Sequence, residues 1–198
     1  MNQEYFNYLK GISWRGRLYR QMFLYRRLSR FCVGEILDVG CGTGAFLHYL
    51  GHGVGVDVNE YCVTYCRSQG LEVDLMQNDI VPVEDCSFGT VILDNVLEHI
   101  QDPENILSEL NRVLRPGGRL IVGVPQEKGY AKDQDHKVFY DKYLLSSVIG
   151  GAGFEPIAIF ETPFSGLGKY VSSSCVYYVG SKKSEIIESS RGLSQRDT

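Results

Sequence analysis

The sequence lacks several features that would assign the protein to a membrane or to the secretory route. No apolar run approaches the roughly 18 residues of a membrane-spanning helix, and the basic start and apolar run of a signal peptide are absent. We therefore expect a cytoplasmic protein. No C-x-x-C pair occurs among the six scattered cysteines, which argues against a zinc knuckle and for reduced thiols. No internal repeat interrupts the 198 residues.

The chain as a whole also has no excess of basic over acidic residues. The net charge of −4 gives no reason to expect a nucleic-acid partner. The first 34 residues are the exception, because they carry seven basic side chains against Glu4. Residues 15–31 have a helical period and place Leu18, Met22, Leu24, Tyr25, Leu28 and Phe31 on one broad face, with Arg20, Arg26, Arg27 and Arg30 mostly opposite.

This N-terminal helix has two open interpretations. It is either a cap packed on the domain with its arginines in water, or a contact for an anionic membrane surface or an anionic substrate. The sequence does not decide between them.

Three glycines at alternate positions follow the first apolar run. Residues 36–39 suit a strand buried on both faces, and residues 45–50 fit a short helix. Between them lie Gly40, Gly42 and Gly44, which tolerate positive φ and let a ligand touch the main chain. The new helix offers unpaired N–H groups at its start. A plain tight turn needs fewer glycines, so the pattern predicts a nucleotide-like ligand at the end of this strand.

A second short strand, residues 53–57, ends in Asp57. In an open parallel sheet, a carboxylate at that strand end reaches a ribose bound over the first turn and accepts hydrogen bonds from its hydroxyls. Asn59 is better placed to cap the following helix, residues 60–69, which Gly70 ends. We therefore expect Asp57 to bind a ribose.

The remaining chain alternates strands and helices. Strands are expected at residues 71–76, 88–93 and 119–124, and a helix over residues 103–114 has Asp102 as its N-cap. A polar loop over residues 126–137 is placed like a substrate lid, and Asp141 caps a further helix. Residues 156–162 and 174–179 then form a hairpin. This order predicts an α/β three-layer sandwich with a mostly parallel sheet.

The motif Asp38-x-Gly40-x-Gly42-x-Gly44 resembles the first motif of the Rossmann-like, class I S-adenosylmethionine-dependent methyltransferases. Residues 88–125, with Leu97-Glu98-His99 and then Asp102-Pro103, resemble the central part of the small-molecule members. The resemblance covers about residues 34–180. It implies a seven-stranded sheet with an antiparallel last strand and S-adenosyl-L-methionine as cofactor. The cofactor contacts that it implies are Asp38, Gly40, Gly42, Gly44, Asp57, Val58, Asp79 at the adenine amino group, Ile80 against the ring, and Asn95.

On this basis the chain divides into an N-terminal helical cap (residues 1–33), an S-adenosylmethionine-binding methyltransferase domain (34–181) and a mobile tail (182–198). The expected reaction is methyl transfer to a small-molecule acceptor, through a hydroxyl that must lose a proton to a base. Two histidines are candidates, although each also suits a structural role. We favour His136, because Asp133 and Asp135 lie close in sequence to orient it, over His99, which follows strand four.

A metal is not expected from the motif. In the resembling ubiquinone-biosynthesis O-methyltransferases, a Glu-x-x-Glu-His cluster binds a metal at the place of residues 95–99. Here Asn95 stands where the first glutamate would be.

Two other functions stay open at this stage. A methyltransferase-like protein that binds the cofactor without catalysis would have the same motif. A dinucleotide-dependent oxidoreductase would share the fold, but its G-x-G-x-x-G spacing is absent.

Overall fold

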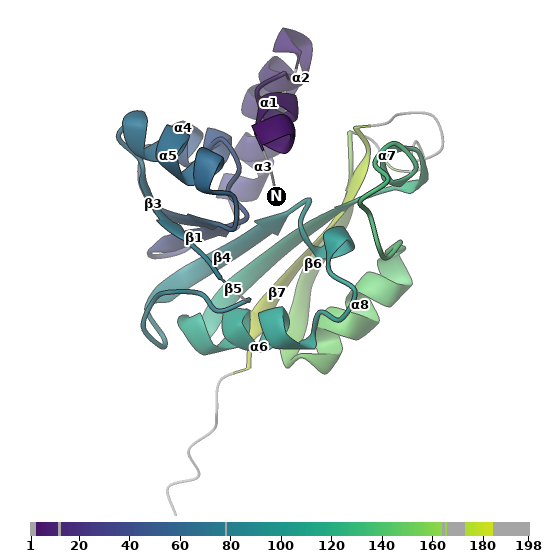
Figure 1. Cartoon of the computed structure of the whole chain (residues 1–198). Helices are drawn as coiled ribbons and strands as arrows, with labels where there is room; N and C mark the ends of the chain where they lie inside the picture. The colour runs from purple at the N-terminus through teal and green to yellow at the C-terminus, as the bar shows by residue number, and fades with distance from the viewer. Residues whose placement is uncertain (1–2, 12, 78, 164, 166–172, 184–198) are drawn as a thin grey trace, which may run out of the picture.

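One seven-stranded sheet forms the centre of the molecule (Figure 1). The computed structural model describes residues 3–11, 13–77, 79–163, 165 and 173–183. The strands lie in the order β3-β2-β1-β4-β5-β7-β6, and only β7 is antiparallel to its neighbours. Their bounds are β1 Ile36–Val39, β2 Val54–Asp57, β3 Glu72–Leu75, β4 Phe88–Asp94, β5 Leu114–Pro125, β6 Phe154–Thr162 and β7 Cys175–Lys182. The predicted α/β fold, with an antiparallel last strand, is confirmed.

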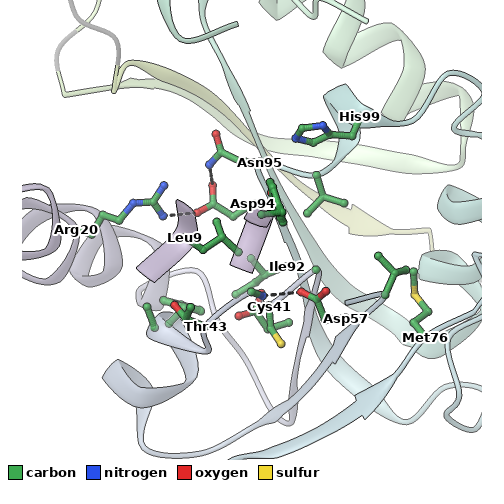
Figure 2. A pocket seen from close by; sticks show the side chains of 18 of the residues that line it. Leu9, Arg20, Cys41, Thr43, Asp57, Met76, Ile92, Asp94, Asn95 and His99 are labelled. Atoms are coloured by element: carbon green, nitrogen blue, oxygen red, sulfur yellow. Dashed lines mark hydrogen bonds and ion pairs between the residues drawn. The ribbon is translucent and has the colours of Figure 1, made fainter. Parts of the chain in front are cut away.

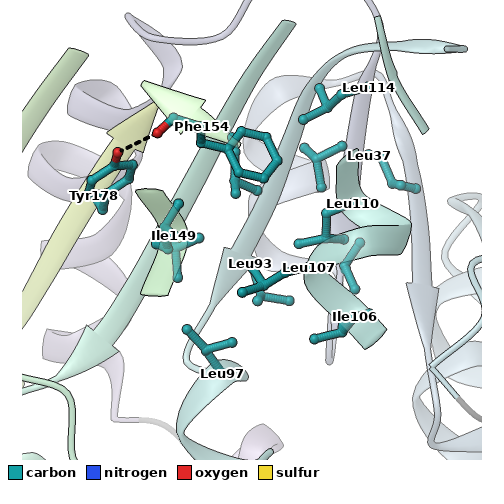
Figure 3. Packing of buried hydrophobic residues seen from close by; sticks show 14 of the residues in the cluster. Leu37, Leu93, Leu97, Ile106, Leu107, Leu110, Leu114, Ile149, Phe154 and Tyr178 are labelled. Carbon is teal, nitrogen blue, oxygen red and sulfur yellow. Dashed lines mark hydrogen bonds between the residues drawn. The ribbon is translucent and has the colours of Figure 1, made fainter. Parts of the chain in front are cut away.

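Helices cover both faces of the sheet, which completes the three layers. Helices α6 (Glu104–Val113) and α8 (Lys142–Gly151) pack on one face. Helices α3 (Tyr25–Ser29) and α4 (Ala45–Leu50) pack on the other face, and α4 also meets α5 (Glu60–Ser68) in a smaller apolar cluster. Alternate side chains of a strand serve opposite faces, so that Leu93 joins the α6 side and Ile92 the α3 side. Figure 3 shows the α6 leucines packed against Leu37 and Leu93.

The N-terminal region differs from the single regular helix that we predicted. It consists of α1 (Gln3–Lys10), which was not predicted, then α2 (Trp14–Tyr19), a π-helical turn (Arg20–Leu24) and α3. Figure 1 shows α1 and α2 standing above the strand ends, whereas α3 lies against the body. Because a π turn holds an extra residue, the 3.6-residue period fails across it.

The predicted division between apolar and basic faces is therefore partly wrong. Leu24, Tyr25 and Leu28 are buried as expected, but Leu18 and Met22 are 46% and 54% exposed. Arg20 does not point into water as predicted, and it contacts the half-buried end of a strand, described below.

Other element boundaries also moved. Asp102 is not the N-cap of α6, because Pro103 occupies that position without a side-chain hydrogen bond. Strand β5 begins at Leu114 rather than at Arg119, and its register against β4 shifts between these two residues, where Gly117 has a φ of 74°. The polar loop contains a short helix, α7 (Glu127–Tyr130), and Asp141 caps α8 as predicted. Residues 184–198 of the predicted mobile tail and most of residues 163–173 lie outside the described residues.

Two expectations about the whole chain have direct structural counterparts. All six cysteines are free, as expected. Among the residues that the structure describes, no helix combines the length and apolar character that crossing a bilayer requires.

Candidate cofactor and acceptor site

A cleft of about 740 Å³ opens where the carboxyl ends of β1, β2 and β4 meet (Figure 2). Helices α1 and α2 and the π turn supply further parts of its wall. We call the part around Gly42 and Asp57 the glycine end, and the part around His99, Asp135 and Lys137 the histidine end. The volume lies in the range of roughly 300–1,000 Å³ that is typical of sites for small organic ligands.

The glycine turn has the strained backbone that its sequence predicts. Gly40, Gly42 and Gly44 have φ values of 70°, 56° and 68°, which side chains rarely tolerate. A Cβ on Gly40 would also lie 2.4 Å from Cγ2 of Val96. The backbone N–H of Gly40 donates to the Val56 carbonyl at 2.8 Å, which ties the turn to the neighbouring strand. Backbone from β1 therefore reaches the floor of the cleft without a side chain in the way.

Asp57 lies at the glycine end, buried to 7% exposure. Its Oδ2 accepts from the Gly42 backbone N–H at 2.7 Å, and its Oδ1 accepts from the Asn59 N–H at 2.8 Å. A carboxylate has about four acceptor positions, so about two remain for a ligand. Asn59 caps α5 by accepting from the Tyr61 N–H, as predicted. Burial raises the pKa of Asp57, and the hydrogen bonds from Asn59 and Gly42 oppose that rise.

Asp38 is the second buried acid of the cleft, at 5% exposure. Burial raises the pKa of its carboxyl to about 8, and the nearby Asp94 and Asp57 carboxyls add to the rise. Three acids therefore converge on one desolvated region, where extra negative charge is unfavourable and positive charge is favoured.

The residues proposed for adenine are only partly brought together. Asp79 and Val58 line the cleft, and Asp79 has an unusual positive φ of 58°. Ile80 does not line it and is 61% exposed. The apolar surface at this place comes instead from Val58 and Met76, and Met76 was not singled out from the sequence.

Asp94, at the end of β4, organises a polar network that the sequence did not reveal. Its Oδ1 accepts from the Tyr177 hydroxyl at 2.7 Å and from the Asn95 amide at 2.9 Å. Its Oδ2 accepts from Arg20 Nη1 at 3.1 Å (Figure 2). Asn95, a predicted cofactor contact, lines the cleft with a positive φ of 57°. Asp94 could have been predicted as a site residue, because it is an acid at the end of a strand. The position of Arg20 beside it could not, because a regular helical period puts Arg20 on the opposite face.

Helix α1 closes the cleft from above. A Cβ on Gly42 would lie 3.3 Å from Leu9 Cδ1, and both Leu9 and Tyr5 line the cleft. Burial raises the pKa of the Tyr5 hydroxyl, and Asp57, Asp133 and Glu98 add to that rise. Tyr5 therefore lies close to both ends of the cleft. Helix α1 buries no residue fully, although Tyr5, Phe6 and Leu9 are half-buried.

The two predicted histidines meet at the histidine end, with ring centroids 4.7 Å apart. His99 lines the cleft, and Figure 2 shows its ring directed toward Asn95. His136 lies behind it with its side chain 8% exposed, and its Nδ1 is 2.8 Å from the Tyr130 carbonyl. The preferred base, His136, thus does not line the cleft, whereas His99 does. Burial and the neighbouring His136 lower the pKa of His99.

Glu98 is the third side chain of this group and was not predicted to be functional. It is 1% exposed, and neither carboxylate oxygen has a hydrogen-bond partner. Burial raises the pKa of this carboxyl to about 8. Its Oε1 lies 3.8 Å from His136 Nε2, and Asp133 Oδ2 lies 4.0 Å from the same nitrogen. The Glu98 backbone carbonyl accepts from the N–H groups of Lys137 and Val138, which fixes the polar loop beside it.

Comparison with known proteins agrees with this geometry. A family profile described as "Methyltransferase domain" matches residues 37–122. A protein of Mycolicibacterium smegmatis named "Probable S-adenosylmethionine-dependent methyltransferase" is 30% identical over 149 residues, which are 69% of this chain and 58% of that protein. A bovine protein named "Probable tRNA methyltransferase 9B" is 32% identical over 126 residues, covering 60% of this chain and 28% of its own length.

The same relationship appears among solved structures. A crystal structure from Thermotoga maritima, described as a SAM-dependent methyltransferase and "possible histamine N-methyltransferase", is 26% identical with a TM-score of 0.64. The match covers 83% of this chain and 94% of that one. The chain spans only 58% of the length of its mycobacterial relative, so it corresponds to part of that protein. Sequence profile, relatives and fold together show that the chain belongs to the Rossmann-like S-adenosylmethionine-dependent methyltransferases.

Proposed function

We propose that the protein transfers the methyl group of S-adenosylmethionine to a hydroxyl of a small molecule. The observation that carries the proposal is the continuity of one cleft. The cleft joins a glycine turn and a strand-end carboxylate, suited to a nucleoside, to a pair of histidines suited to an acceptor. The family uses S-adenosylmethionine as methyl donor, and the cofactor end of this cleft has the matching groups.

The cofactor contacts are assigned as follows. Asp57 accepts hydrogen bonds from the ribose hydroxyls with the acceptor positions that Gly42 and Asn59 leave free. The glycine turn and Asn95 hold the methionine part, and Asp38 lies close by, where a bound positive charge would favour ionisation of its carboxyl. Asp79 binds the adenine amino group, with Val58 as an apolar neighbour. The contact between Ile80 and the adenine ring stays a prediction. Because Ile80 does not line the cleft, the adenine would have to extend beyond the cleft to touch it. Bound there, S-adenosylmethionine supplies an electrophilic methyl group.

The acceptor end has to align the hydroxyl and remove its proton. His99 faces the cleft and is therefore assigned to contact the acceptor, while His136 holds its place from behind. This assignment reverses the preference for His136 that we drew from the sequence. A positioned base contributes about 10²–10⁴ in rate, and alignment with exclusion of water contributes further. Tyr5 and Leu9 of α1 cover the cleft and exclude water from it.

Other acceptors are competing outcomes rather than equal candidates. The bovine relative is named for tRNA, and the Thermotoga structure is described for an amine. A cleft of about 740 Å³, partly walled by α1, and a net charge of −4 favour a small molecule over a nucleic acid. A protein that only binds the cofactor is the remaining alternative. The division at residues 33 and 181 and the cytoplasmic location also stay predictions.

The decisive experiment separates cofactor binding from transfer. Calorimetry should give S-adenosylmethionine binding and no NAD binding. Cell extract depleted of small molecules, extract depleted of RNA, and complete extract are then incubated with methyl-labelled cofactor. The proposal is supported by label that is found in the small-molecule fraction. Ammonia, which cleaves methyl esters, should not release this label, whereas a reagent that cleaves aryl or alkyl methyl ethers should. Label on RNA, or binding without any transfer, contradicts it.

A membrane contact of the N-terminal region is a second proposal about partners. Trp14, Leu18, Met22 and Phe23 are each at least 46% exposed on α2 and the π turn. The first 34 residues carry seven basic side chains against Glu4. Exposed apolar side chains among cations are typical of segments that lie on anionic lipid surfaces. Such a contact would place the mouth of the cleft beside the lipid.

A further inference from the structure

Glu98 is the most unusual side chain outside the cofactor end. Both of its carboxylate oxygens are buried without a hydrogen-bond partner, and the residue is 1% exposed. Leaving a buried carboxylate unpaired is costly, and native structures normally compensate it with a donor or a cation. The His136 ring at 3.8 Å is too far to serve as a hydrogen-bond donor.

The two histidines beside Glu98 are held as metal-binding histidines usually are. Such residues commonly hydrogen-bond through one ring nitrogen to a carbonyl or carboxylate, which fixes the ring and leaves the other nitrogen for an ion. His136 uses Nδ1 toward the Tyr130 carbonyl at 2.8 Å, and its Nε2 faces Glu98. The His99 ring is hydrogen-bonded to the backbone of Asp135. Both supporting carbonyl groups come from the polar loop after β5.

The spacing of the three side chains also suits one ion. One donor atom each from Glu98, His99 and His136 all lie within 4.8 Å of one another. Metal–ligand bonds of about 2.1 Å in a tetrahedral site place ligand atoms about 3.4 Å apart. Shifts of roughly 1 Å per side chain would therefore close the group around an ion. Asp133 Oδ2, 4.0 Å from His136 Nε2, adds negative charge at the rim.

We propose that Glu98, His99 and His136 form a binding site for a divalent transition-metal ion, with zinc as the best match to two imidazoles and one carboxylate. The ion would keep an open position toward the cleft, which His99 lines. The third ligand comes from the loop after β5, and Asn95, whose amide is bonded to Asp94, takes no part. The sequence motif did not predict this site because it counts ligands only within residues 95–99.

The consequence for the acceptor rests on the proposed function. A hydroxyl bound at the open position of a zinc ion loses its proton far more readily than a free one, as zinc-bound water does. Deprotonation then does not require a free imidazole, because both histidines are ligands. In that case the two histidines and Glu98 contribute to transfer jointly, as the ligands of one ion, and not as three independent groups.

The test titrates the full chain, stripped by a chelator and dialysed, with Zn²⁺ alone. The same titration is made on Glu98→Gln, on His136→Asn and on His52→Asn, which removes an exposed histidine far from the group. We expect one equivalent of zinc to bind the wild type and the His52→Asn control alike. Both site variants should bind it more than about 100-fold more weakly, since losing a supporting hydrogen bond alone costs roughly 10–100-fold. Cobalt in place of zinc should give visible absorption bands of a four- or five-coordinate ion only in the wild type and control.

Two results overturn the proposal: no stoichiometric zinc binding by the wild type, or wild-type affinity in both site variants. Thermal melting and S-adenosylmethionine binding of each variant establish that it is folded. The proposed function is judged separately, by methyl transfer. Transfer that persists in chelated protein refutes only the ion's role in deprotonation, while the binding site and the function stand, with the imidazoles acting free. Zinc binding without any transfer refutes the function while the site stands.

Discussion

The ribose contact of Asp57 leads to a prediction that the structure makes quantitative. In Asp57→Ala, about two free acceptor positions disappear from the glycine end, together with the carboxylate that holds the Gly42 and Asn59 N–H groups. Hydrogen bonds to a charged group contribute about 1.5–3 kcal/mol net. Because 1.4 kcal/mol is a factor of ten, S-adenosylmethionine affinity should fall by roughly tenfold to a hundredfold.

Calorimetry at fixed salt measures this loss. The matched control is Glu72→Gln, which removes an exposed carboxylate from the neighbouring strand β3. Asp57→Asn is a second variant that keeps one oxygen and should lose less than Asp57→Ala. Because the new amide has only one acceptor oxygen, either the Gly42 or the Asn59 N–H loses its partner, and Asp57→Asn should melt below the wild type. An unchanged affinity in Asp57→Ala, with a normal melting curve, would remove Asp57 from the cofactor site.

Three further predictions concern the wall of the cleft and the N-terminal surface. Arg20→Gln breaks the ion pair with Asp94 and should weaken cofactor binding several-fold in calorimetry, because the π turn loses its tie to β4, whereas the exposed Arg26→Gln should change nothing. Burial raises the pKa of Asp38 to about 8, above its unfolded value, so the folded state binds the proton more strongly and stability should fall as pH rises from about 4 to 8. That loss amounts to at most about 1.4 kcal/mol per pH unit, and denaturant midpoints in Asp38→Asn should show a flatter pH profile; equal profiles would contradict it. The wild type should sediment with anionic vesicles at low salt and stay in the supernatant at high salt. A smaller fraction of Trp14→Ser should sediment, because an exposed apolar side chain is lost. Sedimentation with neutral vesicles alone would contradict the charge argument.

The glycine end could be predicted from sequence because its signals are local. A buried strand followed by alternate glycines requires positive φ within a few residues, and the structure has it at Gly40, Gly42 and Gly44. The caps at Asn59 and Asp141 are equally local, since each side chain bonds a backbone N–H two residues on. Such patterns do not depend on where the rest of the chain lies.

The N-terminal region could not be predicted in the same way. A helical wheel assumes one constant period, and the π turn at Arg20–Leu24 changes that period in the middle of the segment. Arg20 therefore turned toward Asp94, while Leu18 and Met22 became exposed. Ile80 illustrates a different limit, because matching a family position fixes the backbone and not the direction of the side chain.

The histidine end shows why a sequence motif confined to one segment can miss residues of a site. Glu98 and His99 are adjacent in the chain, but His136 arrives from a loop that begins after β5. That loop is fixed because the N–H groups of Lys137 and Val138 donate to the Glu98 carbonyl at 2.7 and 3.1 Å. The contact uses main-chain atoms on both sides, so no residue type in the loop announces it.

The same contact makes Glu98 an informative position. Its backbone carbonyl holds the loop, whereas its side chain is an unpaired carboxylate beside His136. Glu98→Gln keeps the carbonyl and nearly the same volume, so the loop and both histidines should stay in place. A change in the histidine end of this variant then reports the loss of the carboxyl group's ability to ionise and bind a cation. If the carboxylate merely tolerated burial, replacing it with a neutral amide would stabilise the fold and leave transfer intact. If the carboxylate instead binds a cation or orients the imidazoles, Glu98→Gln should be more stable than the wild type but lose methyl transfer. A gain in stability with a loss of activity is typical of a side chain that is kept for function.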